Sequence, residues 1–263
     1  MLAAPAPAID LDAHVWRAAR GGAGADSGQR AGVTSGFALL DAELPGGGWP
    51  TQGLSEILQA QAGGLEWRLL GPALSGLLQA PAAGPLLLIN PPLMPHLPGL
   101  QAHGIRPQQL VWIRPAPDAD RARHSLWATE QAIKADAAAA ILAWLPAARP
   151  EQMRRLQVAA LGASAPVFIF RPLNARQQSS AAPLRLVLEP GADWHLRVQV
   201  FKRRGPPQIN WLKLAALPAE LAALLSPRVL RPASAPVPVR ETVREHAHEQ
   251  VSAVLARAAA ATH

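Results

Sequence analysis

Apolar residues recur along the chain in short continuous runs, separated by stretches with helical spacing. The runs at 54–58, 85–89, 110–113, 139–144 and 167–170 are typical of strands buried on both faces. Between them, residues 66–78, about 98–102, 120–135 and 150–161 have the composition of amphipathic helices. Buried strands alternating with helices predict an α/β fold with a mainly parallel sheet, covered on both faces.

The pattern changes after Pro172, where shorter runs alternate between apolar and polar positions. The runs "PLRLVLEP", "DWHLRVQVFKRR" and "QINWLKLAAL" predict antiparallel strands, with Leu196, Val198 and Val200 on one face of the second. The polar segment "NARQQSSAAP" just before them is expected to be mobile. The C-terminal side of the sheet is therefore predicted to be antiparallel.

Composition divides the chain into three regions. Residues 1–33 are interpreted as a short helix, 9–20, followed by the flexible Gly-rich linker 21–32. Residues 34–217 form the predicted core, and its first helix would be capped by Thr34 or Ser35 and run to Leu44. Residues 218–263 form a Pro-rich linker and a tail that could be a helix for partner binding or a frayed surface helix.

Composition and charge narrow the function classes. The chain has no cysteine, which excludes disulfides, thiolate metal sites and cysteine nucleophiles. It has no recognisable secretory signal and no apolar run of membrane-spanning length, so a soluble cytoplasmic protein is expected. From Arg154 to Lys213 there are ten Lys/Arg against Glu189 and Asp193, a net charge of +8. This excess suits DNA or an acidic partner surface, and also an Arg-rich solvated face.

The stretch "SEILQAQAGGLEWRLL" has the strand, turn and helix of a phosphate-binding loop. Gly63 and Gly64 are in place, but Leu65 and Glu66 stand where a lysine and a Ser/Thr would be expected. A carboxylate at Glu66 would repel a nucleotide's phosphates unless a metal intervened. The two glycines can equally serve a tight strand-to-helix turn, so no nucleotide or other cofactor is expected.

A nucleotide-hydrolysing site also needs an acid at the end of a neighbouring strand, to orient Mg²⁺ and water. The obvious candidate, "AAAAILAWLPAA", ends in Ala143, Trp144 and Leu145. Two independent parts of the catalytic machinery are therefore missing together, which argues against ATP hydrolysis and predicts no catalytic residues.

Other residue types indicate no further site. The histidines are scattered, so no metal site is expected, and Ser35, Ser55 and Ser75 lack a nucleophile elbow. Tryptophans could stack on nucleic-acid bases, but several fall in predicted strands or helices, where packing is the better interpretation.

The order of these segments resembles the RecA-type ATPase core. "TSGFALLDAELPGGGWPTQGLSEIL" is similar to its first turn and strand, and "LRVQVFKRRGPPQINWLKL" to its late basic hairpin. Within that superfamily, "DAHVWR", "LLGPAL", "LWATEQAIKA" and "FKRRGPP" resemble the ImuA (SulA-like) family of translesion-synthesis proteins, over about residues 12–214. The resemblance implies a RecA-like P-loop fold whose phosphate loop is degenerate.

The resemblance also implies partners. ImuA-like proteins work beside an inactive Y-family polymerase homologue (ImuB) and an error-prone replicative-type polymerase, in SOS mutagenesis on damaged DNA. In RecA-like filaments, a late Lys-x-Lys strand reaches a nucleotide on the neighbouring subunit, and Lys202 and Arg204 match those positions. Lys202, Arg203 and Arg204 are thus predicted to bind a partner such as RecA, although basic residues also protect an edge strand from aggregation.

Two alternative functions stay open at this point. The chain could be a cell-division inhibitor, as the SulA-like label suggests, or an ATPase with an atypical loop. Direct DNA binding, motivated by the +8 segment, could accompany any of these functions.

Overall fold

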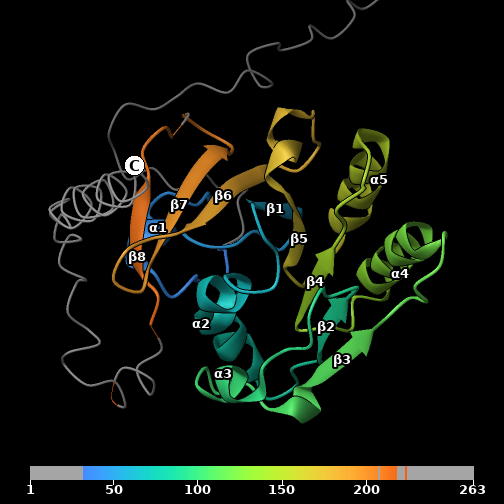
Figure 1. Cartoon of the computed structure of the whole chain (residues 1–263), viewed down its shortest axis with the longest axis horizontal. Coiled ribbons are helices and arrows are strands. Elements are labelled where there is room, and N and C mark those ends of the chain that lie inside the picture. The colour runs from blue at the N-terminus through green and yellow to red at the C-terminus, as the bar shows by residue number, and fades with distance from the viewer. Residues whose placement is uncertain (1–31, 207, 218–222, 224–263) are drawn as a thin grey trace, which may run out of the picture. The chain divides into compact units, whose positions relative to one another are not determined.

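The structure, a computed structural model, describes residues 32–206, 208–217 and 223, so the predicted N-terminal helix and the C-terminal tail lie outside the described residues. The described part folds around one mixed sheet in the order β3-β2-β4-β5-β1-β6-β7-β8 (Figure 1). The strands are β1 (Leu54–Gln59), β2 (Leu86–Ile89), β3 (Leu110–Ile113), β4 (Ala140–Trp144), β5 (Val167–Pro172), β6 (Leu184–Pro190), β7 (His195–Lys202) and β8 (Leu212–Ala215).

The sheet is mainly parallel, with antiparallel strands at its C-terminal side. Strands β1 to β6 run parallel to one another, while β7 is antiparallel to both β6 and β8. The prediction for "PLRLVLEP" was therefore wrong on one side, because β6 pairs in parallel with β1. The connection at 173–183 is long enough to return the chain to the starting end of the sheet before β6 begins.

Helices cover both faces of the sheet, as the alternating pattern predicts (Figure 1). One apolar core joins a face of the sheet to α1, α2 and α3, and a second joins the opposite face to α4 and α5. The helices are α1 (Ala38–Asp41), α2 (Glu66–Leu78), α3 (Leu97–Gln101), α4 (Arg121–Ala135) and α5 (Pro150–Ala160), with 3₁₀ turns η2 (Pro107–Gln109) and η3 (Leu173–Gln177).

The first helix predicted within the core is shorter than expected. It was predicted to run to Leu44 with Thr34 or Ser35 as its cap, but α1 is a single turn with Phe37 at the N-cap. The side chain of Asp41 takes up the hydrogen bonds instead, accepting from the Ser35 N–H at 2.8 Å and from the Thr34 hydroxyl at 2.7 Å. These two bonds close the segment into a compact turn rather than a longer helix.

A buried ionic cluster joins the three central strands. Glu56 of β1 accepts from Arg171 of β5 and from Arg185 of β6, each at 2.8 Å, and all three side chains are buried. Carbonyls of η3 and the residue that follows it, Ala175 and Gln178, accept further hydrogen bonds from Arg185. The segment 174–183, which was predicted to be mobile, thus begins within a 3₁₀ turn whose Ala175 carbonyl accepts a hydrogen bond from a buried arginine.

Candidate functional site

The candidate site is the loop between β1 and α2. The loop turns at Gly63, whose φ of +104° is a backbone conformation that favours glycine. A Cβ added at Gly64 would meet no atom within 4 Å, so packing does not require a glycine at this position. Leu65 precedes the helix, and Glu66 is its first residue.

Glu66 points into the loop and is fully buried, with 0% of its surface exposed. Its Oε1 accepts three hydrogen bonds: from the Gly63 N–H at 2.7 Å, the Gln59 amide at 2.6 Å and the Trp144 indole at 2.9 Å. Its Oε2 has no partner within the described part of the chain. The backbone N–H that a bound anion would use is therefore already paired with a side chain of the same protein.

Trp144 reaches Glu66 from a strand that is not adjacent to β1. The sequence-based interpretation treated β4 as the strand next to β1. In the sheet, β5 lies between them, so β4 is one strand further from the loop than was assumed. The Trp144 ring stacks on Phe170 of β5, with centroids 4.7 Å apart, and so spans the intervening strand. Trp144, at the strand end where an acid was expected, thus donates a hydrogen bond to Glu66, which stands where a Ser/Thr was expected.

Gln59 and Trp144 were not predicted to hold Glu66. A tryptophan at the end of a buried strand was one available signal, because a buried indole N–H needs an acceptor. The other signal was Gln59, a polar residue at the end of a strand whose six residues are all buried. Neither signal identifies the partner, since that depends on how the strands are ordered in the sheet.

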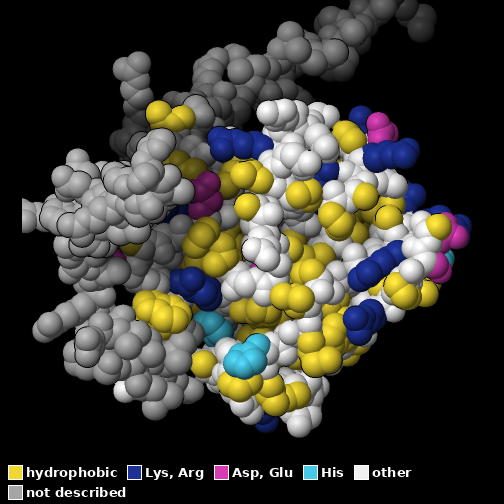
Figure 2. Space-filling model, viewed as in Figure 1, with side chains coloured by type: hydrophobic (Ala, Val, Ile, Leu, Met, Phe, Trp, Pro, Cys, Tyr) yellow, Lys and Arg dark blue, Asp and Glu magenta, His cyan; other side chains and the backbone are white. Residues whose placement is uncertain are grey.

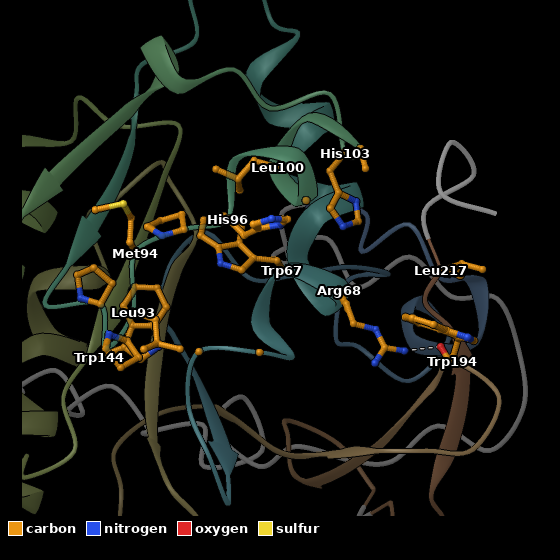
Figure 3. A pocket seen from close by; sticks show the side chains of 17 residues that line it. Trp67, Arg68, Leu93, Met94, His96, Leu100, His103, Trp144, Trp194 and Leu217 are labelled. Carbon is orange, nitrogen blue, oxygen red and sulfur yellow. Dashed lines mark hydrogen bonds between the residues drawn. The ribbon is translucent and has the colours of Figure 1, made fainter. Parts of the chain in front are cut away.

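An apolar cavity of about 320 Å³ adjoins this loop (Figure 3). Leu93 and Met94 lie at one end of the view, and Arg68 and Trp194 at the other. Arg68 donates to the Trp194 carbonyl and lies 5.9 Å from the centroid of the Trp194 ring. Burial lowers the pKa of Arg68 and of His103, so the cavity disfavours added positive charge on His103.

The three predicted partner-binding residues lie at the end of β7 but differ in their surroundings. Lys202 donates to the Ser180 carbonyl at 2.6 Å, and partial burial followed by the charge of Arg185 lowers its pKa. Arg203 bonds the carboxylate and the carbonyl of Glu43, each at 2.5 Å. Arg204 is exposed and makes no hydrogen bond or ion pair within the described part of the chain. Arg203 is therefore engaged within the protein, whereas Arg204 faces outward.

The remaining candidate residues do not converge. No group of three or more acidic or histidine side chains in the described residues could hold a metal ion. Trp144, in a predicted strand, packs in the core as predicted, whereas Trp127, in a predicted helix, is exposed. Trp49 also packs in the core, and Trp194 is exposed. Across the described ranges, no helix combines the length and apolar character needed to cross a membrane.

Comparison with known proteins adds no assignment. No protein-family model matches the chain, and no curated protein matches it. The geometry of the loop and the surfaces around it therefore carry the functional argument.

Proposed function

We propose that this protein is a RecA-like accessory protein of SOS-induced translesion DNA synthesis that neither binds nor hydrolyses nucleotide and acts by protein contacts. The observation that carries the proposal is Glu66, whose carboxylate accepts the Gly63 N–H and the Trp144 indole. A phosphate would have to displace this buried, three-fold hydrogen-bonded group and would meet its negative charge. The mainly parallel sheet with antiparallel C-terminal strands also supports it, because the RecA-type resemblance implies this architecture.

The first test is nucleotide binding. A fluorescent ATP analogue with Mg²⁺ is titrated into the wild-type protein and into Leu65→Lys/Glu66→Thr, which restores the two residue types of a phosphate loop. We expect no binding by the wild type, because Glu66 blocks the loop. Saturable binding or ATP hydrolysis by the wild type, abolished in Gly63→Ala, would favour the atypical ATPase instead.

The second test is partner binding through the end of β7. We expect co-purification with RecA and with an ImuB-like polymerase homologue, and loss of RecA in Lys202→Glu/Arg204→Glu. Arg203 is left unchanged because it holds Glu43 in place. The matched control is Arg106→Glu/Arg154→Glu, two exposed arginines outside β7.

The outcomes separate the functions. Binding that only the β7 variant loses supports an accessory protein with a RecA-facing strand. Capture of neither partner contradicts the proposal, and arrest of division on overexpression without altered damage-induced mutation would favour the division inhibitor.

A further inference from the structure

A second hollow lies at the edge where the parallel strands end, away from β7. It is a groove of about 940 Å³ bordered by the ends of β1, β4 and β5 and by the first turns of α4 and α5. Its walls mix apolar and basic side chains, and Figure 2 shows such a mixture on the side of the molecule where α4 and α5 lie. The apolar part includes Ala60, Leu126, Leu145, Pro146 and Pro172.

The groove carries an excess of positive charge. Four arginines line it, against the single carboxylate of Asp118. Arg123 is paired with Asp120, and Arg171 with Glu56. Arg121 donates to Asn90 at 2.7 Å, and neither it nor Arg149 pairs with a carboxylate in the described residues. The N-terminal ends of α4 and α5 add positive potential at the same place.

Two buried polar atoms in groove-lining side chains also lack partners. Gln59 is 2% exposed and its Oε1, an acceptor, has no donor within the described chain. Arg171 is 3% exposed and its Nε, a donor, has no acceptor there. Each of these two atoms exposes less than 1 Å² of its surface, so both lie beneath the groove wall, and contact with a ligand falls to the arginines that line the groove.

We infer that this groove binds an extended acidic segment of a partner protein. Carboxylates of the segment would meet Arg121 and Arg149, the two groove arginines that pair with no carboxylate in the described residues. The apolar walls would take intervening aliphatic side chains. A nucleic-acid strand fits less well, because the groove's aromatic residues, Trp144 and Phe170, are buried and stacked on each other, so they offer no face to a base.

The experiment measures fluorescence anisotropy of the full chain at low salt with a labelled peptide of alternating glutamate and leucine. A peptide with lysine in place of glutamate and an oligothymidylate serve as comparison probes. The groove variant is Arg121→Glu/Arg149→Glu, and the control is Arg106→Glu/Arg154→Glu. Circular dichroism checks that the variants fold, and Arg149→Glu alone replaces the double variant if it does not, because Arg149 is exposed.

We expect the acidic peptide to bind, the lysine peptide not to bind, and the groove variant to weaken binding by about tenfold or more, while the control retains affinity. Absence of peptide binding, or equal weakening by the control, overturns the inference. Binding of oligothymidylate that only the groove variant loses, with no such effect on the peptide, assigns the groove to nucleic acid instead. All these outcomes are read without RecA, so they are independent of the partner test at β7.

Discussion

A carboxyl group withdrawn from water needs hydrogen-bond donors, and Glu66 has three of them within 3 Å. One comes from the loop backbone at Gly63, and the others come from the ends of two strands. The same residue therefore fixes the loop conformation and occupies the Gly63 N–H at the turn. At the residue scale, the structural role of Glu66 and the proposed loss of nucleotide binding have one cause.

Replacing Glu66 should reveal this structural role. We expect Glu66→Leu to lower the free energy of unfolding by about 3 kcal/mol, because the donors of Gln59, Gly63 and Trp144 lose their acceptor. Glu66→Gln keeps one acceptor oxygen and should lose about 1 kcal/mol. Urea denaturation followed by tryptophan fluorescence measures both. Wild-type stability in Glu66→Leu would show that these donors have other partners.

At the scale of the element, helix α2 connects the loop to the rest of the core. It buries Leu69, Leu70 and Leu74 against the sheet and presents Gly71 to the segment after α3. A Cβ on Gly71 would lie 2.4 Å from the His103 ring, whereas one on Gly76 of the same helix would meet nothing within 4 Å. Close packing against His103 therefore requires a glycine at position 71, whereas no contact requires one at position 76.

The pair gives a matched test of helix packing. We expect Gly71→Ala to destabilise the protein by about 2 kcal/mol, because the His103 ring must move. Gly76→Ala should stabilise it by roughly 0.5–1 kcal/mol, since alanine restricts the unfolded chain without a clash. Thermal unfolding of the two variants measures the difference. A stabilised Gly71→Ala would contradict the packing of His103 on α2.

At the scale of the whole molecule, three acids from outside the basic segment, Glu43, Glu56 and Glu130, neutralise part of its excess charge within the fold. Of the ten Lys/Arg between residues 154 and 213, five form ion pairs: Arg155, Arg171, Arg185, Arg197 and Arg203. Arg171 and Arg185 are buried in the centre of the sheet beside Glu56. A net charge counted along the chain therefore overstates the charge that this region presents to DNA.

Glu56 should matter more to stability than an exposed acid. We expect Glu56→Gln to cost about 4 kcal/mol, because it leaves two buried guanidinium groups without a countercharge. The control is Glu130→Gln, whose partners Lys134 and Arg155 are largely exposed and whose loss should cost under about 1 kcal/mol. Chemical denaturation of both variants measures the contrast. Equal losses would contradict a stabilising role for the buried cluster.

Local pattern determined the elements of this protein. The five early strands and helices α2, α4 and α5 were predicted within one or two residues, because a strand buried on both faces and an amphipathic helix each require a recognisable order of apolar residues. The absence of a lysine at position 65 and of an acid at the end of β4 was also evident from the sequence alone.

Tertiary structure decided what those elements do together. Strand order brought Trp144 across β5 to Glu66, placed β6 parallel to β1, and gathered Glu56, Arg171 and Arg185 from three strands. Local pattern specifies which faces must be buried but leaves open which distant segment covers them. Pairing between residues 78 to 129 positions apart follows from packing of the whole chain, so these partners became visible only in the folded molecule.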